Sequence, residues 1–395
     1  MFFKLMLSNL NLRLKVYALL LDATKAFDRV EFTKLFGLLL DRGMDALFVR
    51  CLLNMYLNQK LRIRWNNCFS EPFSVKNGVK QGGVISPLLF GIYIDVLIKQ
   101  LRDSGLGCYM GPFFIGCITY ADDVVLLSPT KTGLSKMLDI CQEYSETYHL
   151  QFNGGKSQFT VFSPRPTDDE SINVFGNCIT KASSVTHLGH KLYAETRKDD
   201  LEGVISSFYR QYNLFRSKFG QLASSIQAEL FQRYCSSFYG CLLIPFRKLD
   251  RLCVIWRKTS RAVWRLPYRT HCGVVAGLSG SLCGTHMFIS RFMTFASAVM
   301  NHQTDVVRYV MRSALNCPLS IFKENHELCC KHLGLNNQSI PDGLKNNIKV
   351  ICNDQCKMTF ESTVISELAN VQDQLSDTVL NMTEIETIIN HLCLN

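Results

Sequence analysis

Long uninterrupted apolar stretches are missing from this chain of 395 residues, although 47% of its residues are hydrophobic. No run approaches the ~18 apolar residues that a membrane-spanning helix needs. Near the start, Lys4, Arg13 and Lys15 interrupt the apolar residues and no small-residue cleavage pattern follows, so the sequence does not indicate a secretory signal. We therefore expect a protein of the nucleus or cytoplasm that is not secreted and has no membrane partner.

Internal repeats, low-complexity tracts and a compact cysteine framework are also lacking. The 17 cysteines are scattered along a long apolar chain, whereas disulfide-stabilised domains concentrate them in a short one. We expect most of these thiols to be buried as small hydrophobic side chains in a reducing compartment.

Cysteine and histidine residues with the spacing of a metal site are scarce. Residues 326–332 contain two histidines and two cysteines, and Cys352 and Cys356 form a close pair. A compact zinc site needs a second pair of ligands at a similarly short distance. His391 and Cys393 lie too far along the chain to supply it, so we do not expect zinc.

Positive charge is in excess, with 43 Lys and Arg against 33 Asp and Glu and a formal net charge of +10. Residues 247–271 concentrate this excess, since their only acid is Asp250. Cations bind phosphates and aromatic rings stack on bases. We therefore predict nucleic-acid contacts for five residues of this segment: Arg257, Arg261, Arg265, Trp256 and Trp264. The arginines are spaced by four, as on one helical face, and a merely solvated face is the alternative.

Two adjacent acids, Asp122 and Asp123, lie between the apolar residues 113–115 and 124–127. β-Branched and aromatic residues around a short polar break are typical of a hairpin, which would carry the acids at its tip. Asp22 follows another apolar run, residues 16–21, and is expected at the end of a buried strand. If the two segments are neighbours in one sheet, the three carboxylates meet at one point.

Neighbouring carboxylates are costly to bury unless a cation binds them. Mg2+ prefers oxygen ligands and takes one or two protein carboxylates together with substrate phosphates, and two such ions support nucleotidyl transfer. We therefore predict that Asp22, Asp122 and Asp123 are catalytic ligands of two magnesium ions, with Asp123 the least direct. Asp28 is expected to cap or start the helix that begins near Phe32, because aspartate is favoured there.

A glycine-containing loop, Gln81-Gly82-Gly83, precedes a helical apolar pattern. Glycine lets backbone approach a ligand closely, so the loop is expected beside a bound nucleotide. Ser86 then reads as the helix N-cap and Pro87 as the first helical residue. An ordinary turn before a helix is the alternative.

Five segments resemble the motifs of reverse transcriptases from jockey-like non-LTR retrotransposons of the LINE type, and they occur in the same order as those motifs. They are residues 21–30, 77–90, 120–123, 150–157 and 187–189. Residues 256–271 are similar to the segment that follows the thumb in the jockey-like branch. The resemblance covers about residues 16–300.

The resemblance implies an α+β fold. A right-hand polymerase palm, in which an antiparallel sheet is backed by helices, would be followed by a helical thumb and a mostly helical C-terminal region. The implied divisions are an irregular segment 1–15, a palm with a primer-grip hairpin 16–195, a thumb 196–246 and a basic C-terminal region 247–395.

The implied activity is that of an RNA-directed DNA polymerase, with an RNA template, a DNA primer and deoxynucleoside triphosphates as partners. By resemblance, Phe27 is the steric gate that excludes a 2′-hydroxyl, and Gln81 and Gly82 contact the nucleotide. Leu188 and Gly189 correspond to the primer grip. A core aromatic role is the alternative for Phe27.

Lys156 matches the lysine of the fourth motif, which is thought to protonate the departing pyrophosphate. Two alternative roles remain for Lys156: it holds a phosphate as a point charge, or it is an ordinary surface lysine. Family members carry a fingers region before the first motif, whereas only a short stretch precedes Asp22. We therefore expect a chain that lacks the endonuclease and most of the fingers and polymerises weakly. A catalytically inactive nucleic-acid-binding remnant is the alternative function, while residues 266–271 argue against an intron maturase.

Overall fold

The computed structural model describes residues 15–162, 170–195, 198–270, 275, 284–318 and 320–335, with the single residues 350, 352, 354, 358 and 362. Two compact units divide the chain after residue 197. We call residues 15–195 the sheet unit and the described residues from 198 onward the helical unit. The predicted irregular segment 1–15 lies outside the described residues except for Lys15, as do Cys356, His391 and Cys393.

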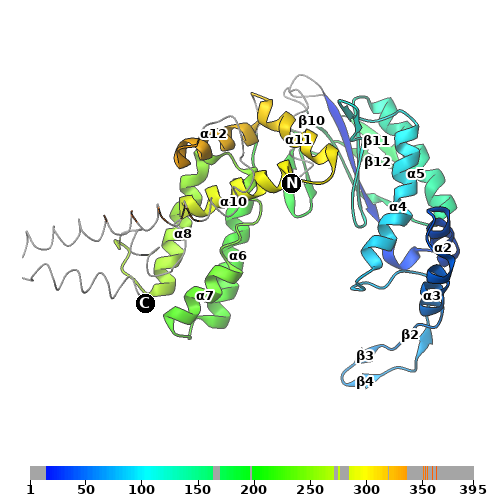
Figure 1. The fold of residues 1–395 in the computed structure, drawn as a ribbon, viewed down its shortest axis with the longest axis horizontal. Coiled ribbons are helices and arrows are strands. Elements are labelled where there is room, and N and C mark those ends of the chain that lie inside the picture. The colour runs from blue at the N-terminus through cyan, green and yellow to red at the C-terminus, as the bar shows by residue number, and fades with distance from the viewer. Residues whose placement is uncertain are drawn as a thin grey trace, which may run out of the picture. The chain divides into compact units, whose positions relative to one another are not determined.

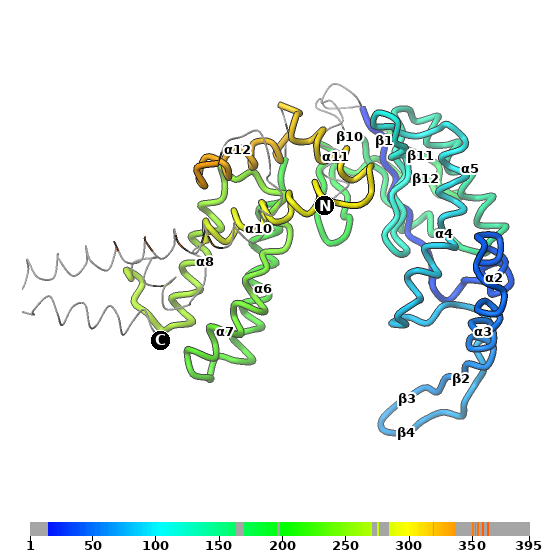
Figure 2. Tube along the Cα trace, viewed as in Figure 1, coloured from blue at the N-terminus to red at the C-terminus, as the bar shows by residue number. Residues whose placement is uncertain are grey.

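A four-stranded antiparallel sheet forms the centre of the sheet unit, in the order β10-β1-β9-β8. The strands are β1 (Val16–Ala23), β8 (Cys117–Tyr120), β9 (Asp123–Ser128) and β10 (Phe152–Phe162). The Cα trace in Figure 2 follows β1 beside β10. β1 is apolar over almost its whole length because both of its edges are paired and most of its side chains are buried.

Helices complete the core around this sheet (Figure 1). They are η1 (Ala26–Arg29), α2 (Phe32–Asp41), α3 (Ala46–Leu57), α4 (Ser86–Asp103) and α5 (Lys131–Tyr148). Tyr93 of α4 and Tyr144 of α5 are fully buried, and the Tyr144 hydroxyl donates to the Tyr93 carbonyl at 2.9 Å. The Tyr93 hydroxyl donates in turn to the carbonyl of Tyr148 at 2.6 Å. These bonds satisfy the polar ends of large apolar rings and fix α4 against α5.

Four small hairpins extend from this core. One joins β2 (Lys60–Leu61) and β3 (Arg64–Trp65) to β4 (Cys68–Phe69) and β5 (Phe73–Ser74). Its turn residues Asn66 and Asn67 have φ of 43° and 64°, as a two-residue hairpin turn requires. The others are β6 (Tyr109–Met110) with β7 (Phe113–Phe114), β11 (Ser171–Val174) with β12 (Asn177–Thr180), and β13 (Ser184–His187) with β14 (His190–Tyr193).

The helical unit contains no strand among its described residues. Its elements are α6 (Leu201–Phe219), α7 (Ser224–Tyr234), η2 (Cys241–Leu243), η3 (Phe246–Lys248), α8 (Leu249–Trp264), α10 (Gly284–Met300), α11 (Asp305–Asn316) and α12 (Ile321–Leu333). Stacked rings such as Phe208 on Phe238, with centroids 4.3 Å apart, fill its interior. The fully buried Asn325 donates to the Ile244 carbonyl and accepts from the Phe246 amide, which ties α12 to the segment before α8.

The predicted α+β architecture, an antiparallel sheet with helices followed by a helical region, is confirmed. In the described part of the chain, none of the helices has both the length and the apolar character needed to cross a bilayer.

Two local predictions are wrong. The strand before the acidic turn is β8, not residues 113–115, because Phe113 and Phe114 pair with Tyr109 and Met110 instead. Ser86 is not the N-cap of α4: Ile85 occupies that position, and the buried Ser86 hydroxyl has no hydrogen-bond partner in the described chain. Pro87 is therefore the second helical residue and not the first, a position that still tolerates proline because amides in the first helical turn have no intrahelical acceptor.

Candidate active site

Asp22 lies directly opposite Asp123 in the ladder between β1 and β9. Asp123 begins β9 and pairs with Tyr120, so Ala121 and Asp122 form a two-residue turn at the tip of the β8–β9 hairpin. Ala121 has a left-handed φ of 52°, which tight hairpin turns need and alanine adopts only at a cost. The structure thus brings all three predicted acids to one end of the sheet.

Negative charge accumulates at this end. Burial, followed by the charges of Asp122 and Asp22, raises the pKa of Asp123 above its ordinary value. None of these three acids forms an ion pair with any residue that the structure describes. Each like charge opposes ionisation of its neighbour, so a bound cation would relieve the repulsion.

No group of three or more histidine, cysteine, aspartate or glutamate side chains within the described ranges is already arranged as a metal cage. The carboxylates nevertheless fit magnesium chemically, because the donors are hard oxygens and Mg2+ needs only one or two of them beside water and substrate phosphates. Burial, and then the charges of Asp122 and Asp22, raise the pKa of Asp123, and a cation bound at the cluster would favour the ionised form again.

Lys156 lies on a bulge of β10 next to β1. The register jumps from Leu20 opposite Gln158 to Asp22 opposite Asn153, which leaves Lys156 outside the ladder and exposed. The Asp22 amide donates to the Ser157 hydroxyl at 3.4 Å. Bulges re-aim side chains and are common beside active sites, and here the residue after Lys156 contacts the backbone of Asp22.

Two glycines and two polar side chains build this bulge. A Cβ on Gly154 would collide with the carbonyl oxygen of Val174. The Ser157 hydroxyl donates to the Asn153 carbonyl at 2.8 Å, and the Lys156 amide donates to Asn153 Oδ1 at 3.2 Å. Asn153 and Ser157 were not among the predicted site residues, although their place inside the fourth motif was a signal for them.

Phe27 follows β1 in η1 and is half-buried. Its ring stacks on Phe90 of α4, with centroids 4.8 Å apart and planes 13° apart. The Val79 amide donates to the Phe27 carbonyl at 2.8 Å, so the chain before the glycine loop is fixed to η1. Asp28 does not cap α2 as predicted: it lies within η1, and the cap of α2 is Glu31.

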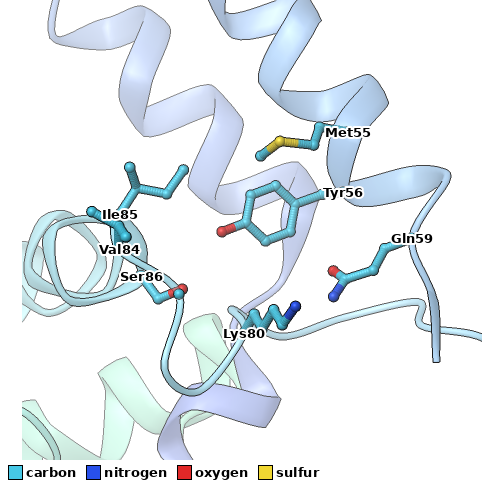
Figure 3. A pocket seen from close by; sticks show the side chains of 8 residues that line it. Met55, Tyr56, Gln59, Lys80, Val84, Ile85 and Ser86 are labelled. Carbon is cyan, nitrogen blue, oxygen red and sulfur yellow. The ribbon is translucent and has the colours of Figure 1, made fainter. Parts of the chain in front are cut away.

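Gln81 and Gly82 are exposed in the loop before α4. Gly82 has φ of +80°, a conformation that favours glycine. Beside the loop is a pocket of about 340 Å³ lined by Met55, Tyr56, Gln59, Lys80, Gly83, Val84, Ile85 and Ser86. Figure 3 shows Met55 and Tyr56 of α3, with Gln59 beyond its end, facing the loop across this pocket. The pocket was not predicted, because α3 and the loop come together only in the folded unit.

Leu188 and Gly189 form the turn of the β13–β14 hairpin, between the paired residues His187 and His190. Both have left-handed φ, 48° for Leu188 and 74° for Gly189. The predicted primer-grip residues are therefore at a hairpin tip. Burial lowers the pKa of the neighbouring His187 to about 4, so this imidazole is neutral at physiological pH.

The basic segment of the helical unit differs from the prediction in one respect. Trp256 is 3% exposed, so it belongs to the core between helices and is not available to stack on a base. Arg257 donates a hydrogen bond to the Cys253 carbonyl, and Arg261 donates one to the Thr270 carbonyl. One nitrogen of each guanidinium group is therefore bound to the protein's own backbone. Arg265 is exposed at the C-cap of α8, and Trp264 is half-buried.

An antiparallel sheet with acids on adjacent strands, joined to helices and a glycine loop, defines the palm of a nucleic-acid polymerase. The family described as "Reverse transcriptase (RNA-dependent DNA polymerase)" matches residues 6–192. This match confirms the resemblance to reverse transcriptases over residues 6–192.

The relatives are retrotransposon proteins. A "Retrovirus-related Pol polyprotein from type-1 retrotransposable element R2" of Nasonia vitripennis is 27% identical over 274 residues, which cover 65% of this chain and 26% of the relative. The "RNA-directed DNA polymerase from mobile element jockey" of Drosophila funebris is 26% identical over 175 residues, 43% of this chain and 19% of the relative. The chain thus spans about a quarter or less of these relatives.

Among solved structures, an apo telomerase from Candida tropicalis overlaps 89% of this chain and 55% of its own, at 13% identity and a TM-score of 0.39.

Proposed function

We propose that this chain carries out RNA-directed DNA synthesis by two-metal nucleotidyl transfer, with Asp22 and Asp122 as the principal metal ligands and Asp123 as the third. The observation that supports it is the direct pairing of Asp22 with Asp123 across β1 and β9, beside the Asp122 turn. Two bound magnesium ions would activate the attacking hydroxyl and stabilise the leaving oxygen.

The chain's own residues then position the substrates. Phe27, held by its stack on Phe90, limits the space beside the sugar and selects deoxynucleotides. Gln81 and Gly82 contact the nucleotide from the exposed loop. Lys156, exposed on the bulge beside Asp22, stabilises the departing pyrophosphate as a positive charge or as a proton donor.

The proposed partners are an RNA template, a DNA primer and deoxynucleoside triphosphates, in the nucleus or cytoplasm. Leu188 and Gly189 contact the primer from their hairpin tip. The proposed nucleic-acid contacts of the helical unit are Arg257, Arg261, Arg265 and Trp264. Trp256 is not one of them, because its side chain is buried.

Primer extension tests this function directly. The full chain is incubated with an RNA template, an annealed labelled DNA primer, deoxynucleotides and Mg2+. We expect extension that Asp22→Asn or Asp122→Asn reduces to background. Asp139→Asn, which removes an exposed acid of α5, is the matched control and should extend like the wild type.

The binding-only alternative makes the opposite prediction. A chain that binds RNA but extends no primer, with equal RNA affinity for wild type and Asp22→Asn, would show that the acids have no catalytic role.

A further inference from the structure

The hairpin of β2, β3, β4 and β5 projects beyond α3 within the sheet unit (Figure 1). Every residue from Lys60 to Ser74 is exposed, including Trp65 at 77% and Phe69 at 61%. Its ladder consists of two short pairings, β2 with β5 and β3 with β4. Because an isolated two-stranded hairpin is marginally stable in water, a bound partner would order this segment.

The charge of this segment indicates the chemistry of that partner. Residues 60–80 contain a single acid, Glu71, and five cations: Lys60, Arg62, Arg64, Lys76 and Lys80. None of the five forms an ion pair within the described chain. An extended polyanion would therefore find several cations here that no acid of the described chain neutralises.

Aromatic rings lie among these cations. Arg64 is paired with Phe69 across the hairpin, and its guanidinium lies 5.8 Å from the centre of the Phe69 ring. Asn67 Oδ1 accepts a hydrogen bond of 2.9 Å from Arg64 and holds the guanidinium in place. Trp65, the next residue, points to the opposite face, as successive strand residues do. A phosphate bound at Arg64 would thus leave its base within reach of an exposed ring.

The hairpin also leads to the candidate active site. Gln59, which precedes it, and Lys80, which follows it, both line the pocket beside the glycine loop (Figure 3). Lys80 is adjacent to Gln81, a proposed nucleotide contact. A strand bound along the hairpin would therefore continue to the loop without leaving the sheet unit.

We propose that residues 60–80 bind single-stranded RNA, with the five cations on its phosphates and Trp65 and Phe69 stacked on its bases. The identification of this RNA as the template rests on the proposed polymerase function. A protein partner fits less well, because lysine is depleted from protein interfaces and three of the five cations are lysines, whereas single-strand binding sites combine cations with exposed rings.

Fluorescence anisotropy of a labelled oligouridylate with the full chain tests this site. The variant Lys60→Gln/Arg62→Gln/Arg64→Gln should flatten the dependence of log Kd on log salt by about 2, since each lost phosphate contact on a single strand removes about 0.7. Trp65→Ala/Phe69→Ala should weaken binding by about 30-fold or more with little change in that slope, since each lost stack costs about 1–3 kcal/mol. All five side chains are exposed, so these changes leave the core intact.

The matched control is Lys99→Gln/Lys131→Gln/Lys136→Gln, which removes the same charge from exposed positions of α4 and α5. It should keep most of the wild-type slope. If control and hairpin variants bind alike, the proposal is wrong. It is equally wrong if the hairpin changes alter only self-association in sedimentation, which would make a second copy of the chain the partner.

Primer extension separates this inference from the proposed function. Hairpin-dependent RNA binding by a chain that extends no primer supports the site and rejects the polymerase. Extension by a chain whose RNA affinity is indifferent to the hairpin supports the polymerase and rejects the site.

Discussion

Asp22 and Asp123 are direct partners across the β1–β9 ladder. Side chains at such opposed positions lie about 4.5–5.5 Å apart at Cβ, and like charges there destabilise the strand pair. Asp122 adds a third negative charge, and burial, followed by the charges of Asp122 and Asp22, raises the pKa of Asp123. The sheet therefore tolerates a repulsive arrangement at one end, as expected where function and stability conflict.

Removing one of these charges should stabilise the protein in the absence of metal. We expect Asp123→Asn in EDTA to raise the thermal unfolding midpoint by about 1–3 °C, because it relieves repulsion from Asp22 and Asp122. Added Mg2+ should stabilise the wild type more than the variant, since ligand binding to the folded state raises its stability. Differential scanning fluorimetry measures both, and a lowered midpoint in EDTA would contradict the role assigned to Asp123.

Shortening Phe27 should relax sugar selection. In Phe27→Val, the ratio of kcat/KM for deoxynucleotides over ribonucleotides should fall by about 10-fold or more, because space opens beside the 2′ position. Phe90→Leu is the control: it removes the stacking partner at 4.8 Å but leaves the Phe27 ring, so stability should fall more than selectivity. Single-nucleotide incorporation assays measure this ratio. An equal ratio of kcat/KM for wild type and Phe27→Val would show that Phe27 does not select the sugar.

Gly78 and Gly82 should differ in their tolerance of alanine. Both have left-handed φ, +96° and +80°, but only at Gly78 would a Cβ approach backbone, 2.9 Å from Asp28. Gly82→Ala should cost the conformational penalty of about 1–2 kcal/mol, and Gly78→Ala should cost more because it also separates η1 from the loop. Urea unfolding monitored by circular dichroism gives both values, and equal costs would show that the close approach relaxes freely.

Acidification should destabilise the sheet unit through His187. Burial lowers the pKa of His187 to about 4 from its ordinary 6.5, so the unfolded chain binds more protons between these values. Stability is then fully present above pH 6.5 and falls as the pH drops toward 4. Urea midpoints at pH 7 and pH 5 test this: the wild type should lose more stability than His187→Gln, and identical losses would assign the effect to other groups.

The elements themselves could be predicted from local sequence. Residues 16–21 are apolar without a break and form most of β1, and the helix expected to begin near Phe32 is α2, which starts at that residue. These signals are local, because strand and helix periodicities are set by neighbouring residues. The turn at Asn66-Asn67 was predictable for the same reason, since asparagine tolerates left-handed φ.

The burial of Trp256 could not be predicted from the local sequence pattern. This residue lies among arginines in the sequence, which suggested a stacking surface, yet packing in the helical unit leaves it only 3% exposed. The helical spacing correctly placed Arg257 and Arg261 one turn apart, but not which neighbours would cover the rest of α8. Burial depends on segments distant along the chain, so periodicity alone does not determine it.

The sequence by itself determined the order of the motifs, the strand that ends near Asp22 and the acidic turn at Asp122, because each depends on adjacent residues. Only the tertiary structure decided that β1 pairs with β9 in the register that opposes Asp22 to Asp123, and that the register of β10 shifts opposite Asp22, which leaves Lys156 outside the ladder. Strand register is a relation between segments about a hundred residues apart. It is set by packing of the whole sheet against its helices, which no local pattern contains.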